Sequence, residues 1–341
     1  MAQNKKKNKR HLLYEIFNPR GNGKGLTKEE AAKPRTAGRF FRFYSTNFNT
    51  MFALNIFALI GNFPILFGLY ALTGSLNINT TSPASSLFGP LYGVTTIKGH
   101  DPVTAALFGV HGTQASVSMP TKATYTFYAL TLLVFLTFGI VNVATTYIMR
   151  NIVKGDSTTF IADIKYSIKR NWKQGLILGI LDLVFILIIA YDLLFFYAAG
   201  SSGMTSFFFG MMLIIAMLYI MMRSYMYIMV VTFDLSIFKI LKNSFIFSLL
   251  GFKRNLAAFA GGLLVWFLDY MILVSFFPIG IILPVMFLIS LTTFMGVYAA
   301  YPKVKEIMID PYYVSDDVGA KLRSEVTEEE EVVEPIMKDR G

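Results

Sequence analysis

Cysteine is absent from this 341-residue chain, and histidine and charged side chains are scarce. Without cysteine, the chain has no disulfide, no thiolate nucleophile and no cysteine-based metal site. Of its three histidines only His100 and His111 stand near each other, so we expect no metal site and no other cofactor. Charged residues make up 15% of the chain, whereas soluble domains hold about 25%.

Long apolar runs accompany this shortage of charge. The chain is 54% hydrophobic and contains 32 phenylalanines. A membrane-spanning helix needs about 20 predominantly apolar residues. Six runs approach or exceed that length, at 47–72, 124–148, 175–198, 206–232, 256–273 and 280–300. The sequence therefore predicts an all-α membrane protein built as a six-helix transmembrane bundle.

The net charge of +10 is distributed unevenly. Twelve Lys and Arg residues fall within residues 1–43, and others fall in the connectors after the second and fourth runs. Basic loops stay in the cytoplasm, so we expect both termini and both basic connectors to be cytoplasmic. The predicted organisation is a basic arm (1–43), a six-span domain (44–301) and an acidic, mostly disordered tail (302–341).

The two basic connectors resemble each other, because each ends in Lys-Arg-Asn just before the next apolar run. Whether this similarity is a true tandem repeat stays open. In the first connector Phe160, Ile164 and Ile168 recur at helical spacing, which predicts an amphipathic helix along the cytoplasmic leaflet. The predicted contacts with anionic lipid or a protein partner, rather than nucleic acid, are Arg150, Lys165, Lys169, Arg170, Lys173, Lys239, Lys242, Lys253 and Arg254.

Residues 73–123 form the one sizeable segment that we expect outside the cytoplasm. Gly, Pro, Ser and Thr dominate it, which favours irregular structure. The segment is either an ordered cap on the bundle or a loop that contacts a partner or ligand, and both interpretations are open.

Four charged residues fall within the predicted spans, namely Asp182, Asp192, Arg223 and Asp269. Such residues are costly in a membrane unless they pair or face water. Asp182 and Arg223 lie at similar depths on consecutive antiparallel helices, which predicts an ion pair. This pair is either structural, which we favour, or lines a polar path for a proton or substrate. Asp192 and Asp269 lie nearer the outer face, where we expect water to reach them.

No motif in the chain indicates catalysis. The sequence contains no GxSxG or other nucleophile motif, and GNGKG at 21–25 lacks the spacing of a phosphate loop. We therefore expect that the protein is not an enzyme.

The segments TTYIMRN (145–151) and IKRNWKQGLILGILDL (168–183) resemble the YesL-like family of bacterial membrane proteins. The residues in the matching places are Thr146, Tyr147, Arg150, Asn151, Asn171, Trp172, Lys173 and Gln174. The similarity extends over residues 40–310. It implies an accessory membrane protein of Gram-positive bacteria, associated with carbohydrate use and sugar ABC importers, and it supplies no catalytic residue.

The predicted function is that of a non-enzymatic accessory or scaffold protein in a bacterial plasma membrane. Its expected partners are the anionic bilayer and the permease or ATPase subunits of a sugar ABC importer. The alternative is a stand-alone transporter or permease with a polar path near Asp182 and Arg223.

Overall fold

The computed structural model describes residues 36–83, 114–200 and 202–311. These residues form two compact units, one within Met1–Asn62 and Phe135–Gly341 and the other within Phe63–Val134. We call them the large unit and the small unit. The predicted basic arm and acidic tail lie mostly outside the described residues.

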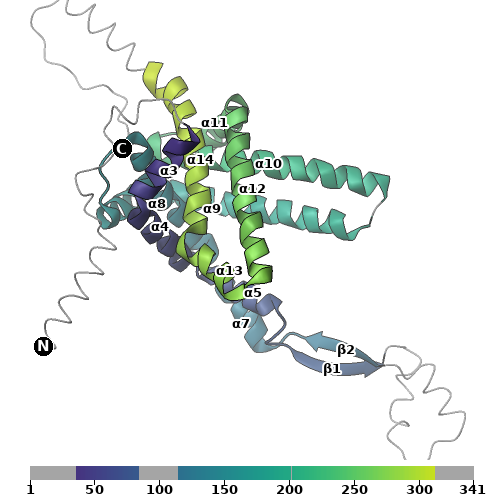
Figure 1. Cartoon of the computed structure of the whole chain (residues 1–341). Helices are drawn as coiled ribbons and strands as arrows, with labels where there is room; N and C mark the ends of the chain where they lie inside the picture. The colour runs from purple at the N-terminus through teal and green to yellow at the C-terminus, as the bar shows by residue number, and fades with distance from the viewer. Residues whose placement is uncertain (1–35, 84–113, 201, 312–341) are drawn as a thin grey trace, which may run out of the picture. The chain divides into compact units, whose positions relative to one another are not determined.

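The described part of the large unit is helical throughout (Figure 1). Its α-helices are α3 (Ala37–Thr46), α4 (Phe48–Gly61), α8 (Val134–Lys154), α9 (Phe160–Ala198), α10 (Gly203–Thr232), α11 (Ile237–Leu250), α12 (Phe252–Ser275), α13 (Phe277–Leu283) and α14 (Ile289–Val304). Two π-helical turns, η2 (Pro284–Leu288) and η3 (Lys305–Ile309), precede and follow α14.

Five helical stretches are long and apolar enough to cross a membrane: Lys122–Lys154, Phe160–Ala198, Gly203–Thr232, Phe252–Ser275 and Phe277–Ile309. A sixth is added if the broken pair of α4 and α5 (Pro64–Leu72) is one span. The predicted run 47–72 is interrupted there because Pro64 has no backbone N–H to continue the helix. The prediction of an all-α protein with the helices of a multi-pass membrane protein is confirmed at this level.

The first basic connector does not form a separate interfacial helix, and that prediction is wrong. α9 runs unbroken for 39 residues. At 1.5 Å per residue it is about 58 Å long, against roughly 30 Å for the hydrocarbon core of a bilayer. No proline or glycine interrupts residues 160–174, so the helix continues into the apolar run. The second connector does form its own helix, α11, which Gly251 separates from α12.

The helices α8 and α9 approach each other so closely that side chains are excluded at their crossing. A Cβ on Gly139 would overlap the carbonyl oxygen of Gly175, and a Cβ on Gly179 would overlap the backbone of Gly139. Glycine is required here by the close contact of two helices. The crossing positions the next turn of α9, which carries Asp182.

The core of the large unit surrounds the C-terminal half of α10. Every residue from Tyr225 to Thr232 is buried, whereas the N-terminal half exposes Met204, Phe207 and Leu213. Figure 1 shows this exposed half beside the end of α9, as a hairpin that extends away from α12 and α14. An apolar, exposed helical surface is what a span needs where it faces lipid.

The π-helical turn η2 is stabilised by the buried side chain of Asn55 on α4. The Asn55 Nδ2 donates to the carbonyls of Pro284 (2.8 Å) and Val285 (2.7 Å), and its Oδ1 accepts from the Ser290 amide (2.8 Å). The widened turn leaves backbone groups without their helical partners, and Asn55 satisfies them. The predicted sixth run therefore contains a distorted turn just before α14.

The small unit combines two short helices with a β-hairpin. The helices α5 and α7 (Lys122–Thr131) pack through Phe67 and Phe127, whose ring centroids lie 5.4 Å apart. β1 (Ile78–Pro83) pairs antiparallel with β2 (Gln114–Met119). The expectation of irregular structure is wrong for these two segments, whose strand-forming residues are Ile78, Thr80, Thr81 and Val117. Residues 84–113 lie outside the described residues.

Candidate functional site

The helices α4, α8, α9, α10, α12 and α14 line a partly open cavity of about 550 Å³ in the large unit. Small residues make room for it, among them Ala258 and Gly262 on α12 and Gly296 on α14. Its polar lining comprises Asn62, Asn142, Thr145, Thr146, Tyr219, Arg223, Ser224, Tyr227, Asn255, Ser290, Thr292 and Thr293. Protein interiors contain few voids larger than a water molecule, so this cavity is the candidate binding site.

Asp182 on α9 is fully buried at the side of this cavity, and its carboxylate is saturated with donors. Arg223 Nε lies 2.8 Å from Oδ2 and 3.1 Å from Oδ1. The hydroxyls of Tyr219 and Tyr227 donate to Oδ1 (2.7 Å) and Oδ2 (2.6 Å). The structure therefore brings together the two residues that the sequence paired. Charge-assisted hydrogen bonds of this kind allow a carboxylate to remain ionised inside a membrane.

The Arg223 side chain also lines the cavity, where 26% of its surface is exposed. Its guanidinium carbon lies 5.3 Å from the ring centroid of Phe138 and 5.2 Å from that of Tyr227. The nitrogen that binds Asp182 is Nε, and the two terminal nitrogens donate to no group within the described residues. These terminal nitrogens can therefore bind an oxygen acceptor of a ligand.

Two oxygen atoms of cavity-lining side chains lack a hydrogen-bond partner within the described residues. They are the Oδ1 of Asn62, just after α4, and the Oγ1 of Thr145 on α8, and both atoms are buried. Buried polar atoms without partners are rare in folded proteins. The cavity that these two residues line is large enough to hold water or a polar solute. The lining thus offers both donors and acceptors to a bound molecule.

The arrangement suits binding better than catalysis. Both oxygens of Asp182 are engaged, so this carboxylate has no free position for proton transfer to a substrate. Within the described residues, no group of three or more His, Asp or Glu side chains is placed to hold a metal ion. Hydrogen bonding to a polar solute is therefore the chemistry that the cavity supports.

The two tyrosines of the network were missed by the sequence analysis, although their spacing contains a signal. Tyr219, Arg223 and Tyr227 follow one another at intervals of four residues, which places them on one face of α10. These three polar side chains form a stripe along one face of an otherwise apolar span. Since Arg223 was already paired with Asp182, the stripe could have been used to predict the two tyrosines as further partners. Thr145 gives no such signal, because threonines within helices commonly bond to their own backbone.

The prediction that Arg150 contacts lipid or a partner is wrong. Only 1% of this side chain is exposed. Its Nη1 donates to Val231 O (2.8 Å) and Thr232 Oγ1 (3.3 Å), and its Nη2 donates to Asn151 Oδ1 (2.8 Å). Arg150 therefore caps the last turn of α10, where a cation is favoured by the helix dipole and satisfies a terminal carbonyl.

The other predicted basic contacts lie on the surface of the large unit. Those that are exposed are Lys165, Lys169, Lys173, Lys239, Lys242, Lys253 and Arg254, while Arg170 is half-buried. Their exposure leaves them accessible to lipid or a partner, and their role stays a prediction.

The two outer aspartates differ from each other. Asp192 is half-buried, but Asp269 is only 6% exposed and its Oδ1 has no partner within the described residues. The expectation that water reaches Asp269 stays a prediction, although its Oδ1 is enclosed by the bundle.

Comparison of the chain with protein-family models, curated proteins and solved structures finds no match. The resemblance to YesL-like proteins rests on the residues quoted above and stays a prediction. Of these residues, Arg150 and Asn151 belong to the network that caps α10.

Proposed function

We propose that the protein is a membrane transport protein that binds a small polar solute in the cavity of the large unit. The observation that carries this proposal is the composition of the cavity wall. Arg223, Asn62 and Thr145 line one cavity in an apolar bundle, and the buried oxygens of Asn62 and Thr145 have no partner within the described residues. Its volume of about 550 Å³ falls within the range of small-molecule sites, roughly 300–1,000 Å³.

The ion pair determines which solute the wall favours. Asp182 balances the charge of Arg223, so a ligand is not required to neutralise an isolated buried cation. The favoured ligand has oxygen acceptors for Arg223 and hydroxyl or amine donors for Asn62 and Thr145. The structural and functional interpretations of the pair are compatible, because the same bonds join α9 to α10 and orient Arg223.

In the proposed topology the chain crosses a bacterial plasma membrane six times, with α4 and α5 together as the first span. Both termini and the basic connectors face the cytoplasm, as the distribution of Lys and Arg favours.

Because the chain has no cysteine, single cysteines can report this topology. An impermeant thiol reagent should label Thr80→Cys on intact cells and Lys239→Cys only after permeabilisation. The reverse pattern would contradict the proposed orientation.

Two matched substitutions on α8 test the transport proposal. Thr145→Val removes an unpartnered hydroxyl from the cavity wall, and Thr137→Val removes a buried, unpartnered hydroxyl that does not line the cavity. Neither change breaks a hydrogen bond within the described residues, so both variants should be as stable as the parent protein.

Uptake of labelled sugars, polyols, amino acids and carboxylates is then compared in cells with and without the protein. We expect at least one solute to enter faster when the protein is present. Thr145→Val should lower its uptake several-fold, and Thr137→Val should leave it unchanged. Uptake that never depends on the protein, or an equal loss in both variants, would contradict the proposal.

A second candidate function, that of an accessory subunit, is supported by a different surface. Lys165, Lys169 and Lys173 are exposed and follow one another at intervals of four residues along α9. The neighbouring Trp172 is 49% exposed. Such a basic surface suits anionic lipid or an acidic partner. In this alternative the protein is non-enzymatic and assists a sugar ABC importer, as the YesL-like resemblance implies.

Purification from native membranes distinguishes the second candidate from the first. The protein is isolated in its parental form and with all three lysines changed to glutamine. A partner that co-purifies with the parent and with Thr145→Val, but not with the triple variant, would support the accessory function. Failure to recover any partner reproducibly would count against it.

A further inference from the structure

The lining of the cavity separates a polar interior from an apolar mouth. All polar residues of the lining are buried or half-buried, among them Thr145 and Arg223. Three lining residues are exposed: Ile220 on α10 (50%), and Leu263 (55%) and Trp266 (44%) on α12. We call these three residues the mouth, because the lining reaches the surface of the large unit there.

The mouth lies near the middle of two helices that are long and apolar enough to cross a membrane. Leu263 stands 11 residues after the start of α12 and 12 before its end. Ile220 stands 17 residues after the start of α10 and 12 before its end. At 1.5 Å per residue, Leu263 is about 17 Å from either end of α12. The hydrocarbon core of a bilayer is roughly 30 Å thick, so in the proposed topology the mouth faces acyl chains. A ligand that uses this opening comes from the bilayer and is amphipathic.

The space behind the mouth is open at Gly262. This glycine lines the cavity next to Leu263, and a Cβ added to it would meet no atom within 4 Å. The exposed half of α10 extends away from α12 (Figure 1), so the two helices diverge on this side. No side chain of residue 262 therefore closes the way from the mouth to the polar interior.

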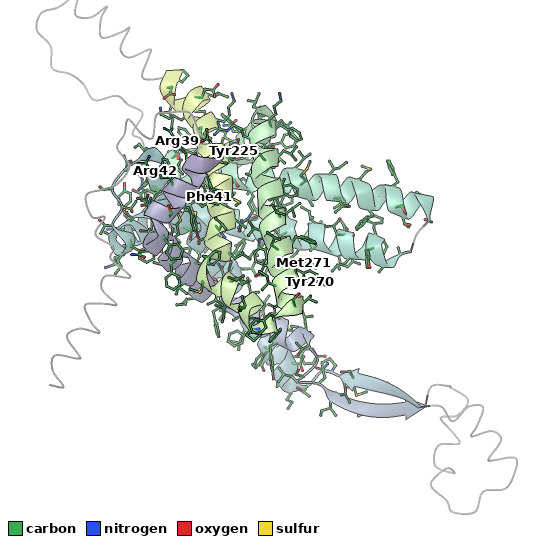
Figure 2. The ribbon with its side chains drawn as sticks, in the orientation of Figure 1. Arg39, Phe41, Arg42, Tyr225, Tyr270 and Met271 are labelled. Carbon is green, nitrogen blue, oxygen red and sulfur yellow. The ribbon has the colours of Figure 1, made fainter. Side chains whose placement is uncertain are left out.

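An exposed, largely apolar stripe continues from the mouth along α12. Leu263, Trp266 and Tyr270 are three and four residues apart and share one face of the helix. Tyr270, labelled in Figure 2, is 57% exposed, and Val274, one turn further, is 66% exposed. In a bilayer such a surface contacts acyl chains. A lipid whose head group enters the mouth can therefore keep its chains on apolar surface.

The interior of the cavity favours one kind of head group. Arg223 is the one charged residue among the described residues of the lining, and no Asp or Glu is found among them. A guanidinium binds phosphate through charge-assisted hydrogen bonds. The amides and hydroxyls of the lining can bond to hydroxyl groups, but a cationic amine in the head group would have no carboxylate in the wall to pair with.

We propose that the cavity binds the head group of an anionic phospholipid that carries hydroxyls, of which phosphatidylglycerol is the simplest probe. The head enters through the mouth while the acyl chains remain in the bilayer. Because the mouth lies about midway along its helices, the bound head can leave toward either leaflet, and the protein moves this lipid between leaflets. The inference rests on the proposed function, since it takes the cavity as the transport site and names its substrate class.

Lipid movement is measured with the full-length protein in phosphatidylcholine vesicles. A trace of phosphatidylglycerol carries a nitrobenzoxadiazole dye on one acyl chain, and external dithionite bleaches the dye in the outer leaflet. We expect the protein to bring the inner-leaflet dye within reach of dithionite, and to move the matching phosphatidylcholine probe several-fold more slowly. Inner-leaflet dye that stays protected, or equal rates for the two lipids, would overturn the proposal.

Two glycine variants test the route through the mouth. Gly262→Leu fills the space behind it, whereas Gly210→Leu adds the same side chain to α10 at a position that does not line the cavity. At both positions an added Cβ meets no atom within 4 Å, so both variants should melt at the parental temperature. Gly262→Leu should slow lipid movement several-fold, and Gly210→Leu should leave it unchanged. Equal rates in the two variants would contradict this route.

Occupation of the cavity is measured separately, through a thiol in its wall. Ser224→Cys lines the cavity, and its reaction with an uncharged methanethiosulfonate reagent is followed in phosphatidylcholine vesicles. Adding unlabelled phosphatidylglycerol to the vesicles should slow this reaction several-fold and leave that of the exposed Lys239→Cys unchanged. An unchanged rate at Ser224→Cys would contradict binding of the head group in the cavity.

These outcomes are distinguishable from those of the uptake experiments with water-soluble solutes. Movement of phosphatidylglycerol without uptake of any such solute would support the lipid as the substrate. Solute uptake that Thr145→Val lowers, in a protein that moves no lipid, would overturn this inference and leave the proposed function standing. Absence of both activities would overturn both.

Discussion

The buried aspartates of α9 and α12 illustrate two ways of placing a carboxyl inside an apolar bundle. Asp182 accepts hydrogen bonds from Arg223, Tyr219 and Tyr227. Asp269 is also buried, at 6% exposure, but its Oδ1 has no partner within the described residues. The comparison shows that burial alone does not determine how many donors a carboxyl oxygen receives. The oxygens of Asp182 join α9 to α10 through charge-assisted hydrogen bonds, whereas Oδ1 of Asp269 makes no such connection.

Removing Asp182 should have the largest effect on stability. Asp182→Ala leaves the charge of Arg223 without its partner and removes the acceptor of two tyrosine hydroxyls. Breaking a buried pair in this way costs about 3–5 kcal/mol. We expect a clearly lower melting temperature in detergent and less protein in the membrane. Asp192→Ala, on the same helix, is the control and should change little.

A double variant shows whether the loss comes from the uncompensated charge. In Asp182→Leu/Arg223→Met both charged groups are replaced by apolar ones, which removes the desolvation penalty together with the attraction. The double variant should therefore melt at a higher temperature than Asp182→Ala. A double variant that is less stable than the single one would show that shape, not charge, dominates this site.

Removing one tyrosine hydroxyl should have a moderate effect. Tyr227→Phe deletes a hydrogen bond to an ionised carboxylate (2.6 Å), worth about 1.5–3 kcal/mol. The matched control is Tyr225→Phe, which deletes a bond of 2.9 Å to the neutral amide of Asn255, worth about 0.5–1.5 kcal/mol. Denaturant unfolding should rank the two losses in that order. Equal losses would contradict the charge-assisted character of the bond between Tyr227 and Asp182.

The substitution Asp269→Asn should have the smallest effect on stability. Asparagine has nearly the same shape as aspartate, and the substitution breaks no hydrogen bond of Oδ1, so we expect a change within about 0.5–1 kcal/mol. The melting temperature of the variant measures this change. A loss as large as that of Asp182→Ala would indicate that the bundle depends on a partner of Asp269, and the contrast between the two aspartates would fail.

The sequence predicted the pairing of Asp182 with Arg223 because depth along a helix can be counted from the end of a span. It could not predict the burial of Asp269, because counting gives no information about which face a neighbouring helix covers. α13 folds back onto α12 one turn further along, where Gly280 contacts Leu273. Contacts across a turn of this kind are set by tertiary packing.

Apolar runs predicted most spans, but they did not predict where the helices end. The connector residues 160–174 are polar enough to lie outside the membrane, yet they also favour helix, so α9 continues through them.

The sequence analysis placed Arg150 at the surface because of its charge. Its partner, the carbonyl of Val231, lies 81 residues away in sequence, and no local pattern indicates that the end of α10 needs this donor.

The most direct test of the central claim, that the cavity binds a polar solute, uses the cysteine-free background of the chain. Ser224→Cys places a thiol in the cavity wall, and Leu213→Cys places one on the exposed apolar half of α10. The rate of reaction with a water-soluble methanethiosulfonate reagent is measured for both in membranes. We predict that Ser224→Cys reacts, that the transported solute slows this reaction, and that Leu213→Cys does not react. An unreactive Ser224→Cys, beside a reactive Lys239→Cys surface control, would contradict the claim.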